Sequence, residues 1–135
     1  MEPSPELRAV IDGWFDSVAA GDLTWADRHI SVRDGVRLIG TDPREFLEGR
    51  GVYEFLKGEA EMLSGNVTVT RGDSEAFREG SVGWGVARPI ITLPNGIEFA
   101  PRWSGVFHRE DGVWKLVHCH ASLGISNEEA MGRED

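Results

Sequence analysis

Cysteine, basic residues and long hydrophobic runs are all scarce in this sequence, and each scarcity excludes a class of protein. The 135 residues contain one cysteine, Cys119, so no intrachain disulfide can form, and this cysteine content is typical of a reducing compartment. Fourteen Lys and Arg against 23 Asp and Glu give a formal net charge of −9, so neither nucleic acid nor an anionic membrane surface is an expected partner. No run of about 18 apolar residues predicts a membrane span, and the opening residues MEPSPE show no secretory signal. We therefore expect a cytoplasmic protein.

The length and composition are those of one folded domain. Hydrophobic residues make up 40% of the chain and charged residues 27%, which is ordinary for a globular protein. We expect a single domain over 1–135, with frayed segments at 1–4 and 127–135.

The first half of the chain has the periodicity of helices. Apolar residues spaced three and four positions apart over 7–18 predict a first helix, capped by Ser4 and ended by Gly21. A short helix over 24–30 and a brief strand over 36–40 are expected next. The third predicted helix has an apolar face that consists of Val52, Phe55, Leu56, Ala60 and Leu63.

The second half has the shorter period of strands. Two short strands, a long β-prone run over 81–93 and returning strands over 97–108 and 113–125 predict an antiparallel meander. Pro89 cannot donate to a strand ladder, so a bulge or a sheet edge is expected there. Helices followed by strands predict an α+β fold, in which a curved antiparallel sheet carries three N-terminal helices on its concave face.

The last strand is apolar on both of its faces under strict alternation. Trp114 and Leu116 fall on one face, and Val117, Cys119 and Ala121 fall on the other. A sheet with one solvated face alternates more cleanly than this. We therefore expect the convex face to pack against a second copy of the chain in a two-fold dimer, with coverage by the C-terminal segment as the alternative.

Aromatic residues and one arginine indicate where a small ligand would bind. Trp14, Tyr53, Trp84 and Trp103 fall on apolar faces of predicted helices and central strands, so they are expected to converge between the two layers. There they either line an apolar pocket or fill the core. Arg88 points either outward or into that pocket, where it would favour an anionic group or a carbonyl oxygen.

No pattern in the sequence defines a catalytic or metal centre. His118 and His120 are two apart on a strand and share a face, but a metal needs a third ligand and no further cluster has ligand spacing. We expect neither a metal nor a cofactor. His29, Asp34 and Tyr53 are candidates for proton transfer, and none is paired with a second carboxylate, so whether the protein is an enzyme stays open.

Residues 111–122, DGVWKLVHCHAS, resemble the closing strand of SnoaL-like domains in the NTF2-like superfamily. They are also similar to the last strand of the association domain of calcium/calmodulin-dependent protein kinase II. The order of predicted elements agrees with that family over nearly the whole chain. The resemblance implies a cone of curved sheet closed by helices, usually dimeric, with a central pocket.

The resemblance also implies which way side chains face. Cys119 and Ala121 would face the pocket, and Ala121 and Gly105 match positions where the kinase domain has pocket arginines. Tyr53 matches a pocket histidine of the kinase domain, so the pocket of this chain would lack basic groups that the kinase domain has. The residues expected on the opposite, dimer-side face of the closing strand are Trp114, His118, His120 and Ser122.

Together these observations predict a SnoaL-like protein that binds a small, mainly apolar organic ligand in the conical pocket. A ketosteroid-isomerase-like isomerase, a hydratase or a cyclase are the reactions that the resemblance suggests. The alternative is a non-catalytic association module that uses the sheet face. The expected partners are a second copy of the chain and a small organic molecule.

Overall fold

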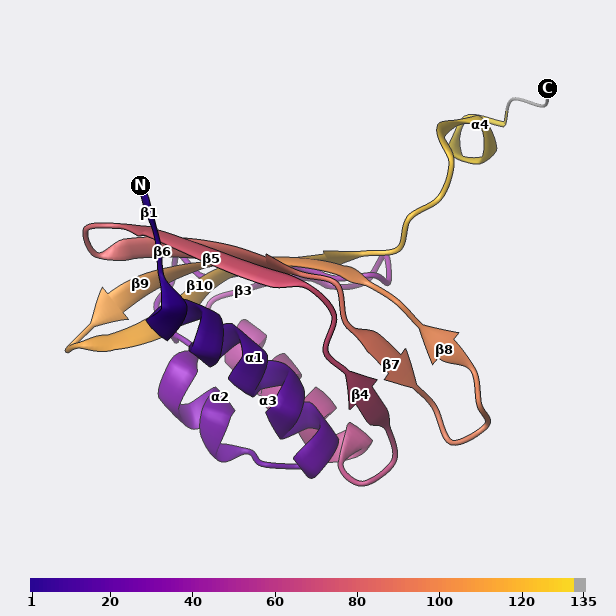
Figure 1. The fold of residues 1–135 in the computed structure, drawn as a ribbon, viewed down its shortest axis with the longest axis horizontal. Helices are drawn as coiled ribbons and strands as arrows, with labels where there is room; N and C mark the ends of the chain where they lie inside the picture. Colours follow the sequence, from indigo (N-terminus) through magenta and orange to yellow (C-terminus); the bar gives the residue numbers. More distant parts are fainter. Residues whose placement is uncertain (133–135) are drawn as a thin grey trace.

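The computed structural model describes residues 1–132, which form a layer of helices packed on one face of a sheet. Helices α1 (Pro5–Ala20), α2 (Thr24–His29) and α3 (Arg50–Leu63) lie together below the large sheet in Figure 1. Helix α4 (Asn127–Ala130) stands apart from them. This arrangement confirms the predicted α+β fold. No helix within 1–132 is both long and apolar enough to cross a membrane.

The strands of the described residues form a seven-stranded sheet and a three-stranded sheet. The large sheet has the order β1-β5-β6-β9-β10-β2-β3, and the small sheet has the order β4-β7-β8. The bounds of the strands are β1 Glu2–Pro3, β2 Arg37–Ile39, β3 Phe46–Glu48, β4 Thr68–Thr70, β5 Ser74–Glu79, β6 Val82–Ala87, β7 Ile90–Thr92, β8 Glu98–Phe99, β9 Arg102–Glu110 and β10 Val113–Ser122.

Two details differ from the predicted meander. Strand β2 runs parallel to β10, whereas the other strand pairs are antiparallel. These two strands are distant in sequence, so no hairpin turn dictates their relative direction. Strand β3, which was not expected from the sequence, pairs with β2, and α3 starts after Gly49, whose φ is 61°.

Helix α1 has the ends that the sequence predicts. The Ser4 hydroxyl accepts a hydrogen bond from the Leu7 N–H at 3.2 Å, and Gly21 adopts the left-handed conformation with φ 71°. The helix lies close to β6 because Gly85 has no side chain. A Cβ there would stand 2.3 Å from Ile11 Cδ1 and 2.6 Å from the Glu75 carbonyl oxygen. The predicted stripe of apolar residues is thus buried against the sheet.

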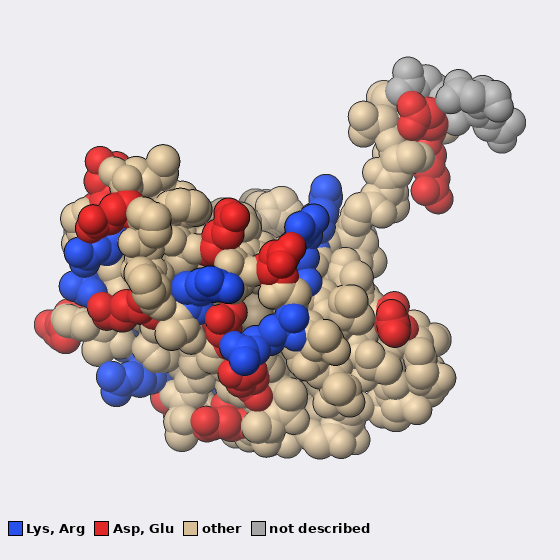
Figure 2. Space-filling view, in the orientation of Figure 1, with Lys and Arg blue, Asp and Glu red and all other residues tan. Residues whose placement is uncertain are grey.

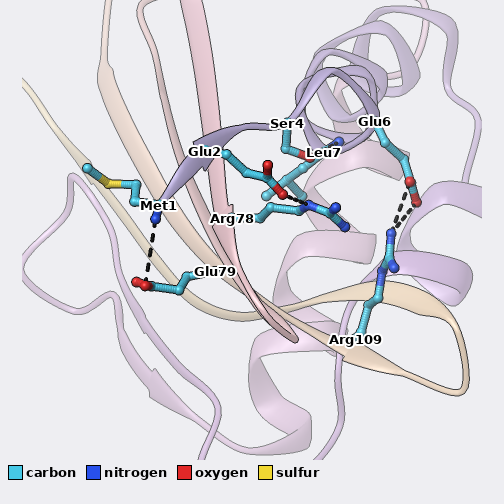
Figure 3. Close-up of polar contacts among 8 residues, drawn as sticks. All are labelled: Met1, Glu2, Ser4, Glu6, Leu7, Arg78, Glu79 and Arg109. Carbon is cyan, nitrogen blue, oxygen red and sulfur yellow. Dashed lines mark hydrogen bonds and ion pairs between the residues drawn. The ribbon is translucent and has the colours of Figure 1, made fainter.

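The first residues of the chain attach to the edge of the sheet (Figure 3). Strand β1 pairs with β5, and the Glu2 carboxylate lies 2.9 Å from Arg78 Nε on that strand. In the first turn of α1, Glu6 accepts hydrogen bonds from Arg109 of β9 at 3.0 Å. These contacts hold residues that were expected to fray.

The C-terminal segment leaves the body of the molecule after β10 (Figure 1). The Ser126 hydroxyl caps α4 by accepting from the Glu129 N–H at 3.0 Å. The segment 127–135, expected to fray, therefore contains one short helix, and its residues 133–135 lie outside the described residues.

Three neighbouring strands are interrupted at the same level, and this break separates the two sheets. The long run expected over 81–93 divides into β6 and β7 at Arg88 and Pro89, and Pro101 separates β8 from β9. Beside them, a Cβ on Gly72 would stand 2.0 Å from the Arg88 carbonyl oxygen, so only glycine fits there. Proline has no N–H for the ladder. The small sheet therefore turns toward the helices (Figure 1).

Strand β10 contains an irregularity that decides where its side chains point. Its register against β9 shifts between Leu116 and His118, so Val117 is an extra residue. Trp114 before the shift and Cys119 after it are consequently both buried on the helix side, with 1% and 3% exposure. The bulge explains why the strand is apolar at both parities, and it moves Trp114 away from the dimer-side face where we expected it.

Charged side chains of both signs are interspersed on the face shown in Figure 2. Ion pairs account for part of this pattern. The guanidinium of Arg71 lies 3.5 Å from Asp12 Oδ2 and 3.4 Å from Asp16 Oδ1, both on α1. Arg88 Nη2 lies 3.1 Å from Asp73 Oδ2. Such exposed pairs contribute little to stability individually.

Candidate functional site

A partly open cavity of about 100 Å³ lies between α1, α3, β10 and the small sheet. Each of the surrounding elements contributes an apolar side chain to its wall. Those side chains include Trp14 from α1, Phe55 from α3, Ile91 from β7, Trp103 from β9 and Ala121 from β10. The break between the two sheets creates the cavity, because it brings β7 and β8 over the end of the helix layer.

Four of the seven residues expected to line a pocket do line this cavity: Trp14, Trp103, Cys119 and Ala121. The Trp103 indole lies against Gly105, where a Cβ would stand 2.5 Å from Cη2 of that ring. Burial raises the pKa of the Cys119 thiol to about 12, so it stays protonated and is a poor nucleophile.

Trp84 lies on the opposite side of the sheet. Gly83 and Gly85 take the inner positions of β6 beneath α1, so alternation turns the indole of Trp84 to the outer face. There it stacks on Phe77 of the neighbouring strand, with ring centroids 6.4 Å apart. A helix this close to β6 leaves no room for an indole.

Arg88 and Tyr53 also lie outside the cavity. Arg88 is exposed at the break between the sheets, where Asp73 pairs with it. The Tyr53 hydroxyl donates to the carboxylate of Asp27, which also accepts from Lys57 Nζ at 2.9 Å. These hydrogen bonds hold the pKa of Asp27 below its usual range.

The remaining titratable candidates lie away from the cavity. His29 ends α2, and its Nδ1 donates to the Trp114 carbonyl oxygen at 2.9 Å, while burial lowers the pKa of its imidazole. Asp34 is exposed in a turn. Alternation after the bulge in β10 places His118 and His120 on the outer face, together with Ser122. Within 1–132, no group of three or more His, Cys, Asp or Glu side chains is placed to hold a metal ion.

Two carboxylates in the cavity wall were missed from the sequence: Glu45 and Glu59. Glu59 lies on the buried stripe of α3, four residues after Phe55 and four before Leu63, and this position on an apolar stripe is the signal that could have found it. Burial raises the pKa of the Glu59 carboxyl above its ordinary value of 4.5, and the charge of Glu45 adds to the shift.

Glu45 is positioned by a tight loop before β3. The Gly40 N–H donates to the Glu45 carbonyl oxygen at 2.8 Å. The Glu45 side chain lies over Gly40, where a Cβ would stand 2.1 Å from Oε1. Among the described residues, no Lys, Arg or His lines the cavity. The site is therefore an apolar cavity whose ionisable side chains are acids and a thiol.

A curved sheet with helices packed on one face is also the fold of solved NTF2-like structures. The family model of the SnoaL-like domain matches residues 7–126, and the chain belongs to this family.

Three solved structures illustrate the similarity. An NTF2-like protein of unknown function from Pseudomonas putida KT2440 has a TM-score of 0.75 at 15% identity, with 92% of this chain and 88% of that one covered. A candidate dehydratase of the NTF2-like family from Streptomyces avermitilis has a TM-score of 0.70 at 18% identity, with 90% of this chain and 95% of that one covered. The association domain of C. elegans CaMKII has a TM-score of 0.66 at 16% identity, with 87% of this chain and 93% of that one covered. At these identities the similarity shows the fold alone. No curated protein sequence matches the chain.

Proposed function

We propose that this SnoaL-like protein binds a small, mainly apolar organic molecule in the cavity between its helices and its sheet. The observation that carries the proposal is the cavity itself, about 100 Å³ in volume, with aromatic and aliphatic walls and an opening to solvent. This volume is smaller than the apolar cavity of about 150 Å³ that binds benzene, so a ring-sized ligand must also occupy the opening to solvent. The ligand is therefore a compact ring or chain, or a longer molecule whose end enters the cavity.

The candidate dehydratase among the solved structures supports an enzymatic use of such a cavity. Proton transfer in an isomerase, hydratase or cyclase needs an acid or a base beside the bound molecule. Glu45 and Glu59 are the groups in the cavity wall that supply this chemistry. The fold hosts many functions, so the proposal of proton transfer depends on these two residues rather than on the fold.

Blocking the cavity tests ligand binding. The probe is toluene, titrated while the amide and indole signals of the protein are followed by NMR. Ala121→Phe puts a ring into the cavity and is expected to abolish the shifts that toluene causes in the wild type. Ala9→Phe makes the same change at an exposed site on α1 and leaves them intact. Equal shifts in both variants, or none in the wild type, would contradict the proposal.

A second proposal concerns the outer face of the large sheet, which we infer joins two copies of the chain. Trp84 and Phe77 stack there, and Val82 and Val86 are 40% and 46% exposed on the same face. A contiguous exposed apolar surface favours association, and the CaMKII association domain has the same fold. His118, His120 and Ser122 lie on this face as well.

The oligomeric state tests this second proposal. We expect sedimentation velocity to show a dimer at micromolar concentration, and Val86→Asp to convert it to a monomer. Met62→Asp, at an exposed apolar residue of α3 away from the sheet, leaves the dimer intact. A wild-type monomer at the same concentration would refute the inference.

A further inference from the structure

The acidic character of the cavity limits which molecules it accepts. Its wall is mainly aromatic and aliphatic, and its carboxyl groups are those of Glu45 and Glu59. A carboxylate, sulfonate or phosphate bound there would be desolvated beside these groups with no cation from residues 1–132 in the wall to compensate it. The electrostatics of the site therefore disfavour anions.

Burial of Glu59 favours the neutral form of its carboxyl group. It lies half-buried on the inner stripe of α3, and it makes no hydrogen bond or ion pair with residues 1–132. Lys57, two residues earlier, is engaged by Asp27 outside the cavity and offers no counter-charge. An unpaired carboxyl in an apolar wall is costly when ionised, because ionisation requires hydration that the wall does not provide.

We propose that Glu59 is the polar anchor of the cavity, and that the cavity selects uncharged ligands carrying a hydrogen-bond-accepting oxygen, such as a ketone or an ether, over anions. This inference rests on the proposed ligand-binding function and specifies its substrate class. The carboxyl O–H of Glu59 donates to the ligand oxygen, while the surrounding aromatic and aliphatic side chains contact the hydrocarbon part of the ligand.

The protonation state of Glu59 supports this donor role. Burial, and next the charge of Glu45, raise the pKa of the Glu59 carboxyl, so the carboxylic acid persists to higher pH than in an exposed glutamate. The other titratable groups of the cavity are Glu45 itself, from the loop before β3, and the Cys119 thiol of β10, which burial keeps protonated. Ligand affinity should therefore fall as the pH rises and Glu59 loses its proton.

Three probes of similar shape separate the effects of apolar contact, of a hydrogen-bond-accepting oxygen and of negative charge on binding. They are methylenecyclopentane, cyclopentanone and cyclopentanesulfonate. They are titrated by NMR at about pH 5 and about pH 8, because a larger fraction of Glu59 is protonated at the lower pH and its raised pKa increases that fraction. We expect cyclopentanone to bind the wild type at about pH 5 roughly fivefold to tenfold more tightly than the hydrocarbon, the gain from one hydrogen bond. The sulfonate binds more weakly than either, and the preference for the ketone shrinks at the higher pH.

Two variants connect these preferences to Glu59. Glu59→Gln keeps an N–H donor, so it retains the ketone preference but loses its pH dependence. Glu59→Leu binds the ketone no better than the hydrocarbon. Glu54→Gln, an exposed position on the same helix, behaves as the wild type.

The outcomes distinguish this inference from the proposed function. If the hydrocarbon binds but the ketone preference is the same in the wild type and in Glu59→Leu, or if the sulfonate binds as tightly as the ketone, the role of Glu59 is refuted and the cavity remains a ligand site. If none of the probes binds, the proposed function itself fails. A carbon-13 titration of the Glu59 carboxyl gives a test without ligand, and a pKa at or below the ordinary 4.5 would refute the inference.

Discussion

Adding one methyl group at Gly85 tests the close contact between α1 and the large sheet. In Gly85→Ala the new Cβ would stand 2.3 Å from Ile11 Cδ1 and 2.6 Å from the Glu75 carbonyl oxygen. The first contact is relieved by a rotamer change of Ile11, which costs about 1 kcal/mol. The second involves backbone, so β5 must move. We expect the variant to lose about 2 kcal/mol of unfolding free energy, within the range of overpacked cores.

Urea unfolding followed by tryptophan fluorescence measures this loss. A loss of about 2 kcal/mol raises the unfolding equilibrium constant roughly thirtyfold and lowers the melting temperature by roughly 8 °C. Gly35→Ala is the matched control, because a Cβ there meets no atom within 4 Å, and its change should stay within about 1 kcal/mol.

A double-mutant cycle separates the two contacts. Ile11→Val removes Cδ1 and alone costs about 1 kcal/mol. The double variant with Gly85→Ala should lose about 1 kcal/mol less unfolding free energy than the sum of the two single losses, because Ile11→Val opens the space that the new methyl group needs. If Gly85→Ala is as stable as Gly35→Ala, or if the two substitutions are strictly additive, the close approach of α1 to β6 does not limit this core.

Three further predictions concern single groups. Ser4→Ala removes the cap of α1 and should lower the unfolding free energy by about 1 kcal/mol in urea titrations, whereas no change would mean that the cap is replaced by water. Burial lowers the pKa of His29, so the stability that its neutral form contributes is lost as the pH falls below 6.5. The unfolding free energy of His29→Gln, measured across the same pH range, should depend less on pH than that of the wild type. The raised pKa of Glu59 has the opposite sign, so wild-type stability relative to Glu59→Gln should fall as the pH rises above 4.5, and a rise would contradict the burial of that carboxyl.

Local patterns were sufficient to predict most elements of the fold. The spacing of apolar residues over 7–18 gave α1, and Ser4 and Gly21 gave its ends, because caps are local interactions. The role of Pro89 was also foreseen in part, since a missing N–H interrupts any ladder. That the interruption would coincide with Pro101 and Gly72 on neighbouring strands depended on strand register, which no local pattern determines.

The candidate site was less predictable than the fold. Trp14 and Trp103 were identified because each lies on the apolar face of a regular element. Trp84 was placed on the wrong side of its strand, because the glycines beside it, which carry no hydrophobic signal, take the inner positions. Glu59 was missed because a carboxylate on a helix ordinarily faces water, and only the tertiary packing of α3 against α1 and the two sheets makes its surroundings apolar.

From its order of apolar repeats, turns and caps, the sequence alone determined that the long helices lie in the first half of the chain, that most strands lie in the second half and that the helices cover one face of a sheet. These features depend on interactions within a few residues of each other. Tertiary structure decided the parallel pairing of β2 with β10, the bulge at Val117 and the cavity at the break between the sheets. Each of these arises where segments distant in sequence meet, because packing and register between such segments, rather than local preference, set which side chains share a space.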